Sequence, residues 1–217
     1  MLTIYGVYRS RASRNIWLAN ELGIPFRLVP VMQLYRLSAE AAKGTLHTKS
    51  PEFLKINPNG HVPSVDDDGL VLHESLAINL YLAKKHGGPL APRNMGEEGL
   101  MTMWTLWAAT EVEPHSINVL NHRVAKPPAE RDPKLAQAAV EALRAPFAVL
   151  DKELAAASHL VGGRFTVTDI NVAEVVRYAL AAPELFEAAP RVKDWLAACH
   201  ARPAFKDMWA KREAEPA

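Results

Sequence analysis

The sequence predicts a mixed α/β domain over residues 1–88, a linker over 89–94 and an all-helical domain over 95–217. Three observations support this division. Short apolar runs alternate with helical patterns in the first part. Pro-Leu-Ala-Pro-Arg-Asn follows without periodicity, and only helical patterns come after it. A chain of 217 residues is long enough for two domains that each bury a core.

The first domain is expected to contain a mixed β-sheet. Its elements follow in the order strand, helix, strand, two hairpin strands and helix. We expect them at residues 2–5, 13–22, 26–31, 62–65, 70–72 and 75–86. A strand-helix-strand unit implies a parallel pair, and a hairpin turning at Asp68-Gly69 adds antiparallel strands. The polar, alanine-rich segment 33–50 is expected to be a loop with some helix.

The second domain is expected to be a helical bundle. Its predicted helices cover residues 97–122, 133–157, 165–180 and 191–201. Pro114 and Pro146 lie inside two of them, and each is expected to kink or interrupt its helix because proline lacks a backbone N–H. Thr166 and Asp169 match a capping box, which fixes the start of a helix and carries no chemistry.

Composition narrows the class of function. The net charge of +1 gives no reason to expect nucleic acid or a membrane as the main partner, and no apolar run approaches the ~20 residues of a membrane span. The N-terminus lacks a signal-peptide pattern, so a cytoplasmic location is expected. The single cysteine, Cys199, is expected to be buried, and the first domain has no redox thiol of its own. No metal site is expected.

A hydroxyl-rich segment lies between the first predicted strand and the first helix. It reads Tyr-Arg-Ser-Arg-Ala-Ser-Arg over residues 8–14. The start of a helix presents free N–H groups and a partial positive charge, which favour an anion. Ser10 or Ser13 can therefore donate a hydrogen bond to a thiolate there. The alternative is that either serine only caps the helix while the arginines are solvated.

Two further segments have the features of a peptide-binding site. A cis bond between Val62 and Pro63 is expected to turn the Val62 backbone outward, where it can pair with an extended peptide. Ser75, at the start of the next helix, can hold a carboxylate, and Glu74 can pair with an ammonium group. The alternatives are an ordinary proline-bounded turn and a plain helix cap. Taken together, the three segments describe a cysteine-containing tripeptide with a free α-amino acid end, which is glutathione.

The same residues resemble the soluble glutathione S-transferase superfamily, most of all its serine-type bacterial and theta-like members. The resemblance rests on Ser-Pro-Glu-Phe-Leu-Lys-Ile-Asn-Pro-Asn-Gly-His-Val-Pro over residues 50–63, on Glu74-Ser75 and on the capping box. It implies a thioredoxin-like N-terminal domain that binds glutathione and a helical domain that supplies most of the second-substrate pocket. It also implies a homodimer.

The resemblance implies a role for individual residues. Ser10 is the expected thiolate-stabilising hydroxyl, with Ser13, Tyr5 and Tyr8 as alternatives. The Val62 backbone, followed by cis Pro63, is expected to pair with the cysteinyl unit of glutathione. Glu74 and Ser75 are expected to hold the γ-glutamyl end. The candidates for the glycyl carboxylate are His61, His47 and Lys49.

The second-substrate pocket has five candidate residues: Tyr8, Arg11, Trp107, Glu111 and His115. The last three follow a four-residue helical spacing and are expected to share a face, although Trp107 fits a core position equally well. The expected activity is transfer of glutathione to a small electrophile. A glutathione-dependent peroxidase, an isomerase or dehalogenase, and a non-catalytic binding module are the alternatives.

Overall fold

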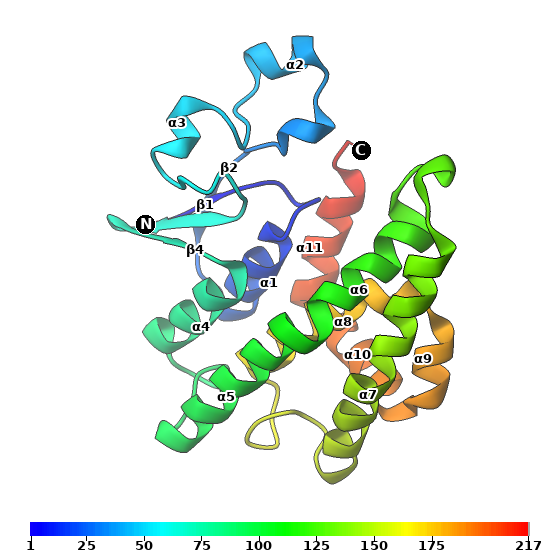
Figure 1. The fold of residues 1–217 in the computed structure, drawn as a ribbon. Coiled ribbons are helices and arrows are strands. Elements are labelled where there is room, and N and C mark those ends of the chain that lie inside the picture. Colours follow the sequence, from blue (N-terminus) through cyan, green and yellow to red (C-terminus); the bar gives the residue numbers. More distant parts are fainter. Residues whose placement is uncertain (217) are drawn as a thin grey trace. The chain divides into compact units, whose positions relative to one another are not determined.

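The chain forms two compact units in the computed structural model, which describes residues 1–216. Unit 1 comprises residues 1–86 together with the segment that begins at Arg202, and unit 2 comprises Gly87–Ala201. Unit 1 contains a four-stranded sheet with helices, whereas unit 2 is helical in its described structure (Figure 1). The expected pair of a mixed α/β domain and a helical domain is confirmed.

The sheet of unit 1 has the strand order β2-β1-β3-β4. Strand β1 (Leu2–Tyr5) pairs in parallel with β2 (Phe26–Val29) and antiparallel with β3 (Ser64–Asp67). Strand β3 also pairs antiparallel with β4 (Leu70–His73). The sheet is therefore mixed, as the order of predicted elements required. Asp68 and Gly69 make the hairpin turn with positive φ angles of 53° and 94°.

Two long helices follow strands of this sheet. Helix α1 (Ala12–Leu22) connects β1 to β2 and buries Ile16, Trp17 and Leu18 completely. Helix α4 (Ser75–His86) follows β4 and buries one face. The segment between β2 and β3 contains helical pieces, as expected. They are the 3-10 turn η1 (Leu34–Arg36), α2 (Ala39–Gly44) and α3 (Pro51–Leu54).

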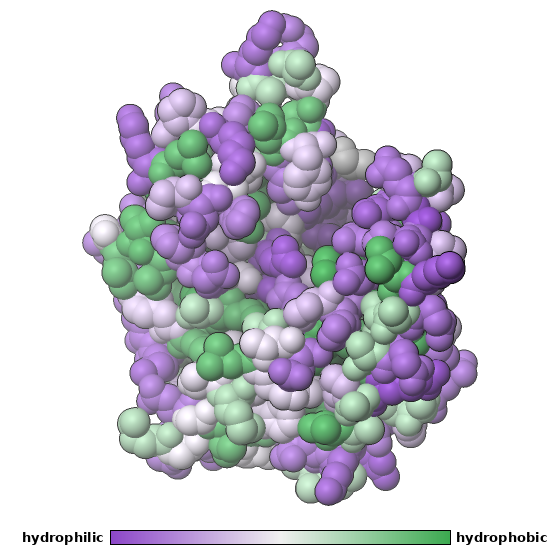
Figure 2. All heavy atoms as spheres, viewed as in Figure 1, coloured by the Kyte–Doolittle hydropathy of each residue, from purple (hydrophilic) through white to green (hydrophobic). Residues whose placement is uncertain are grey.

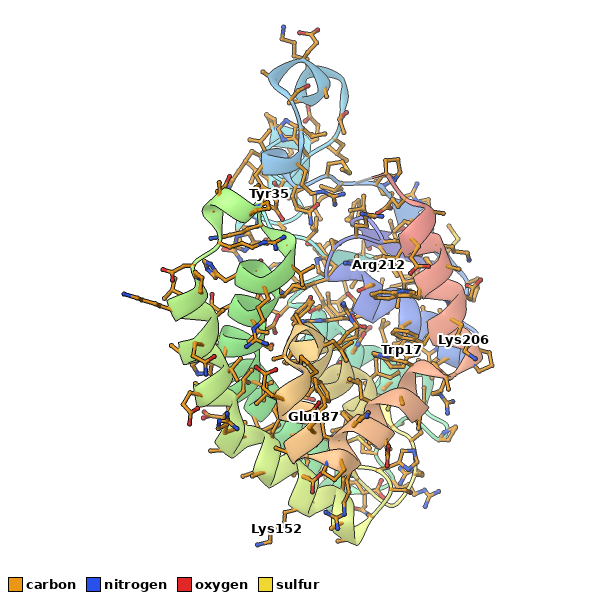
Figure 3. The ribbon with its side chains drawn as sticks, turned by 90° about the vertical axis from the view of Figure 1, so that its right-hand side faces the viewer. Trp17, Tyr35, Lys152, Glu187, Lys206 and Arg212 are labelled. Atoms are coloured by element: carbon orange, nitrogen blue, oxygen red, sulfur yellow. The ribbon has the colours of Figure 1, made fainter. Side chains whose placement is uncertain are left out.

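The last helix, α11 (Pro203–Ala214), packs against α1 within unit 1. The rings of Trp17 and Phe205 meet edge to face with centroids 4.9 Å apart. The guanidinium of Arg202 donates to both carboxylate oxygens of Glu21 over 2.7 and 2.8 Å. Figure 3 shows Trp17 beside α11, which also carries the labelled Lys206 and Arg212. The compact units thus differ from the expected division, because this helix joins the unit that contains the sheet.

Unit 2 consists of helices and helical turns. They are α5 (Met95–Trp107), η2 (Ala108–Val112), α6 (Glu113–Leu120), η3 (Asn121–Ala125), η4 (Pro128–Glu130), α7 (Pro133–Ala156), α8 (Val167–Val176), η5 (Arg177–Ala181), α9 (Pro183–Ala188) and α10 (Pro190–His200). The turns η2 and η3 are π-helical. None of the described helices is both long and apolar enough to cross a membrane.

The two prolines inside predicted helices behave differently. Pro114 lies in the first turn of α6, where its missing N–H costs little, and the π-helical turn η2 precedes it. Of the kink or interruption expected at Pro146, the interruption is ruled out, since α7 continues through this residue from Pro133 to Ala156. Leu143, Phe147 and Leu150 are buried around this proline, and their packing offsets the one hydrogen bond that it removes.

The predicted capping box is confirmed at the start of α8. Thr166 caps the helix, and the Asp169 side chain accepts a hydrogen bond from the Thr166 backbone over 2.8 Å. The same carboxylate also accepts from the indole of Trp195 over 2.9 Å. Both residues of the box are completely buried. The box therefore holds α8 in place and links it to α10. The expected burial of Cys199, on α10, is also confirmed.

Candidate functional site

The strand register brings three predicted site segments to one end of the sheet. Tyr5, the last residue of β1, lies opposite Ser64, the first residue of β3. Ser64 in turn lies opposite His73, the last residue of β4. This row of Tyr5, Ser64 and His73 places the Ser10 loop, Val62-Pro63 and Glu74-Ser75 next to one another. The three segments expected to hold one ligand thus meet at one edge of unit 1.

Gly6 lies between the Ser10 hydroxyl and Val62. Its φ is +152°, and a Cβ built on it would lie 3.5 Å from Ser10 Oγ and 3.6 Å from Val62 Cβ. The same Cβ would come within 2.7 Å of the Cβ of Ala12, closer than folded proteins tolerate. A glycine is therefore required for the chain to bring the hydroxyl and the Val62 segment this close.

The Ser10 hydroxyl is oriented by backbone groups. Its Oγ donates to the carbonyl of Val7 over 2.7 Å and accepts from the N–H of Ala12 over 3.1 Å. A hydroxyl proton rotates freely, so it can turn from the carbonyl to a ligand while the Ala12 N–H stays bonded to the oxygen. That retained bond polarises the hydroxyl and makes it a better donor.

The alternatives to Ser10 differ from it in their surroundings. Ser13 is completely buried inside α1, whereas Ser10 retains 9% exposure. Burial raises the pKa of the Tyr8 phenol, with smaller opposing and reinforcing effects from Lys211, Asp207 and Glu215. The Tyr5 ring lies 6.5 Å from that of Phe53. Of the two serines, Ser10 alone combines some exposure with a defined orientation, whereas Tyr5 and Tyr8 are both partly exposed.

The predicted cis bond between Val62 and Pro63 is confirmed. Asn57, which the sequence analysis did not single out, holds the segment in place. Its side-chain amide donates to the carbonyl of His61 over 2.8 Å and to the Ser64 hydroxyl over 3.1 Å. Asn57 is buried and Val62 is partly exposed. The hydrogen bonds of Asn57 therefore fix the loop on both sides of Val62, whose backbone can face a ligand.

The candidates for a glycyl carboxylate lie around Gly60. His61 and Lys49 are exposed, and His47 is partly buried. The Nδ1 of His47 accepts a hydrogen bond from the Lys49 backbone over 3.1 Å. The ammonium of Lys49 lies 3.0 Å from where a Gly60 Cβ would be. Lys49 and His61 thus flank the same glycine.

Glu74 adopts a conformation that non-glycine residues rarely take. Its φ is +72°, and its side chain is exposed. A non-glycine residue in this region costs about 1–3 kcal/mol and persists where the surrounding structure demands it, which occurs often at ligand sites. Ser75 follows it as the first residue of α4 and is buried. The pair therefore presents an exposed carboxylate beside the free N–H groups of a helix start.

Arg14, the last residue of the segment 8–14, makes a contact with Ser75 that the sequence did not predict. Its guanidinium donates to the Ser75 hydroxyl over 3.1 Å, and the side chain is only 1% exposed. Asn15 donates to the Ser75 carbonyl over 2.8 Å and to Asn79 over 2.7 Å. The contact could not be read from the sequence, since Arg14 and Ser75 lie 61 residues apart. A buried positive charge therefore lies next to the hydroxyl expected to hold a carboxylate.

The candidates for the second-substrate pocket are divided between the units. Arg11 is exposed at the start of α1, in unit 1 with Tyr8. The Trp107 ring meets that of Trp104 edge to face at 5.0 Å, which supports a packing role. Glu111 lies in the π-helical turn η2, a feature that often marks functional sites. His115, on α6, is partly buried.

Among the described residues, no group of three or more histidine, cysteine, aspartate or glutamate side chains could hold a metal ion.

The fold and this edge of the sheet define a class of protein. A four-stranded mixed sheet with a cis-proline before its third strand, followed by a helical unit, is a thioredoxin-like two-domain architecture. Residues 4–90 match the family model "Glutathione S-transferase, N-terminal domain", and residues 117–203 match "Glutathione S-transferase, C-terminal domain".

Individual relatives agree with these matches. Glutathione S-transferase 3 of Zea mays is 30% identical, and the alignment covers 94% of this chain and 91% of the relative. Glutathione S-transferase GstB of Escherichia coli K12 is 29% identical, with 96% and 97% covered. The structure of a theta class glutathione S-transferase from Xanthomonas axonopodis pv. citri, with glutathione bound, superposes with a TM-score of 0.81 at 28% identity over 95% of each chain.

The chain belongs to the cytosolic glutathione S-transferase superfamily. The expected family, the thioredoxin-like fold and the enzyme class of glutathione transferase are confirmed.

Proposed function

We propose that unit 1 binds glutathione at the edge formed by β1, β3 and β4, and that Ser10 stabilises its thiolate for attack on a small electrophile. The row of Tyr5, Ser64 and His73 carries this proposal, because it unites three segments of complementary chemistry. A structurally similar theta class enzyme has been solved with glutathione bound, which supports the choice of ligand.

The γ-glutamyl end fits the Glu74-Ser75 segment. Its carboxylate would accept from the Ser75 hydroxyl and from the first N–H groups of α4, where the helix dipole favours an anion. Arg14 donates to the Ser75 oxygen, so the Ser75 proton stays available for the ligand. The exposed carboxylate of Glu74 would pair with the ammonium group.

The cysteinyl unit fits between Val62 and Ser10. The Val62 backbone would pair with it as an added strand does, while His61 and Lys49 attract the glycyl carboxylate. Val62 and the Ser10 hydroxyl both lie next to Gly6, which lets these two segments come close together. The sulfur would then lie within reach of the Ser10 hydroxyl, at the start of α1.

Ser10 acts by stabilising a charge and forms no covalent bond. A free thiol has a pKa of ~8.5, so little thiolate is present at neutral pH. Stabilising the thiolate by ~2 kcal/mol lowers that pKa by roughly 1.5 units, which one charge-assisted hydrogen bond can supply. The thiolate forms the new carbon–sulfur bond, and the leaving group of the electrophile departs with its electron pair.

The second substrate and the quaternary structure are the less direct parts of the proposal. The proposed second-substrate residues remain Tyr8, Arg11, Trp107, Glu111 and His115.

A homodimer is supported by exposed apolar side chains on α5, namely Met95, Leu100, Met103 and Leu106. Figure 2 shows apolar residues along this helix among polar ones. The cytoplasmic location stays a prediction.

Retention on immobilised glutathione tests the binding step. The wild-type protein is expected to be retained, to be eluted by free glutathione and to conjugate 1-chloro-2,4-dinitrobenzene. Ser10→Ala is expected to be retained while its kcat falls, and Ser13→Ala serves as the matched serine control. Failure of the wild type to bind would contradict the glutathione assignment. Retention without turnover of any electrophile or peroxide would favour the binding module.

A further inference from the structure

The C-terminal segment binds the backbone that immediately precedes Ser10. The Glu215 carboxylate accepts a hydrogen bond from the N–H of Tyr8 over 2.9 Å with one oxygen. Its other oxygen accepts from the N–H of Arg9 over 2.7 Å. Glu215 is partly buried, and hydrogen bonds that involve an ionised group are stronger than neutral ones. One side chain, 205 residues further along the chain than Ser10, therefore fixes two consecutive backbone groups.

Guanidinium groups reinforce this contact from both sides. Arg9 donates to the carbonyl of Arg212 over 3.1 Å and to that of Glu213 over 3.4 Å. Arg212 donates back to the carbonyl of Tyr8. The two segments are therefore joined by donors from each to the backbone of the other.

A third guanidinium, that of Arg36, also joins the C-terminal segment to the loop before Ser10. Arg36, from η1, donates to the carbonyl of Arg9 and to that of Pro216, each over 3.2 Å. It also donates to the Gln33 side chain over 3.2 Å. The backbone of Tyr8 and Arg9 is thus held through its two N–H groups and its two carbonyls. We call the set of Arg36, Arg212 and Glu215 the tail clamp.

The tail clamp is anchored on the helix that follows Ser10. Helix α11 packs on α1 through Trp17 and Phe205, and Arg202 pairs with Glu21. Helix α11, which leads to the tail clamp, is therefore held to the middle and the end of α1, while the tail clamp holds the loop that precedes α1. Connecting loops are otherwise the more mobile parts of a fold.

We propose that Glu215 is a positioning residue for thiolate formation, acting through the Tyr8-Arg9 backbone on the Ser10 hydroxyl. This inference rests on the proposed function, in which Ser10 donates to the sulfur. A hydrogen-bond donor contributes fully only when it is held at the right place in advance, and a misplacement of about 1 Å can cost ~100-fold in rate. The tail clamp supplies that constraint from the opposite end of the chain.

The sign of the pKa change separates positioning from simple electrostatics. Removing the negative charge of Glu215 would, through relief of Coulomb repulsion alone, favour the thiolate and lower the pKa of the bound thiol. Loss of positioning has the opposite effect, because a loosened Ser10 donates a weaker hydrogen bond. We therefore expect Glu215→Ala to raise the pKa of bound glutathione toward its free value of ~8.5.

The experiment compares Glu215→Ala with Glu213→Gln. The Glu213 side chain accepts from Trp209, and only its backbone carbonyl contacts Arg9. The thiolate absorbance of bound glutathione is titrated, and kcat and KM are measured with 1-chloro-2,4-dinitrobenzene. Glu215→Ala is expected to lose roughly 10-fold in kcat, to keep KM for glutathione within about 2-fold and to raise the thiol pKa. Glu213→Gln is expected to match the wild type, and Glu215→Gln, which keeps one acceptor oxygen, to lie between the two.

Two negative results have different meanings. If the wild type binds glutathione as a thiolate and Glu215→Ala leaves or lowers the thiol pKa, the positioning role is wrong and the proposed function stands. If the wild type binds no glutathione, the proposed function itself fails. Hydrogen exchange of the Tyr8 and Arg9 amides provides a structural check that needs no ligand. Faster exchange in Glu215→Ala supports the tail clamp, and unchanged exchange overturns it.

Discussion

The guanidinium of Arg14 donates a hydrogen bond to the hydroxyl of Ser75 over 3.1 Å. This contact joins the first turn of α1 to the first residue of α4, which follow different strands of the sheet. Arg14 is buried, so its charge acts in a medium of low dielectric constant. The start of α4 therefore receives a positive charge from a neighbouring helix in addition to its own dipole.

Replacing Arg14 tests this relationship. Arg14→Met keeps much of the apolar stem and removes the charge, so we expect the fold to persist while KM for glutathione rises about 10-fold or more. Thermal unfolding checks the fold, and initial rates at varied glutathione give KM. Arg27→Met, an exposed arginine on β2, is the control. An unchanged KM in a folded Arg14→Met protein would show that Arg14 is purely structural.

The positive φ angle of Glu74 predicts that a glycine at this position increases the stability of the fold and weakens glutathione binding. Glu74→Gly relieves the positive φ of 72° and is expected to stabilise the fold by up to ~1 kcal/mol. The same change removes the ammonium partner and is expected to weaken glutathione binding about 10-fold. Asp68→Gly is the matched control, since Asp68 has a φ of 53° in the hairpin turn. It is expected to leave binding unchanged, and weakened binding in both variants would contradict a specific role for Glu74.

The buried carboxylate of Asp169 is expected to dominate the stability of unit 2. It accepts hydrogen bonds from Thr166, from Trp195 and from the backbone of Leu160. Asp169→Ala leaves these donors buried without an acceptor and is expected to cost ~3–5 kcal/mol. Thr166→Ala removes the cap and the hydrogen bond that the Thr166 hydroxyl donates to Asp169 over 3.1 Å, and is expected to cost about 1–2 kcal/mol. Denaturant unfolding measures both, and similar losses for the two variants would refute this ranking.

Much of the fold was predictable because it depends on local patterns. The strand at Leu2–Tyr5, the Asp68-Gly69 turn and the helix at Ser75–His86 follow from apolar spacing and turn chemistry. The continuation of α7 through Pro146 was not predictable, because the burial of neighbouring side chains in the folded protein offsets the hydrogen bond that the proline removes. The return of α11 to unit 1 was also not predicted, because its partner Trp17 lies nearly 190 residues away in the sequence.

The candidate site shows the same distinction. Glu74, Ser75, Val62 and the cis Pro63 carry recognisable local signals, and the structure brings them to one edge. Arg14 carries no such signal, because an arginine at a helix start is ordinarily solvated. Its role depends on the packing of α1 against α4, which is a property of the folded protein.

Stability is expected to depend on the protonation of His200. Burial lowers the pKa of His200 to about 4, with Glu174 acting to raise it and Arg177 to lower it. The unfolded chain, with a histidine pKa near ~6.5, binds more protons between these values. Stability is therefore lost as pH falls from about 6.5 toward 4, by roughly 3 kcal/mol.

The variant His200→Gln tests this pH dependence. The free energy of unfolding is measured from pH 7 to pH 5, and His200→Gln is expected to give a flatter curve than the wild type. His86→Gln, at an exposed position of α4, is expected to keep the wild-type slope. Parallel curves for His200→Gln and the wild type would show that another group causes the loss.

The most direct test of Ser10 as the activating hydroxyl is a titration of bound glutathione, followed by the ultraviolet absorbance of its thiolate. We expect the wild type to lower the pKa of the bound thiol by roughly 1.5 units. We expect Ser10→Ala to return the pKa to near ~8.5 and Ser13→Ala to leave it low. A thiol pKa that stays low in Ser10→Ala, or that rises only in Ser13→Ala, would contradict the assignment of Ser10 as the activating hydroxyl.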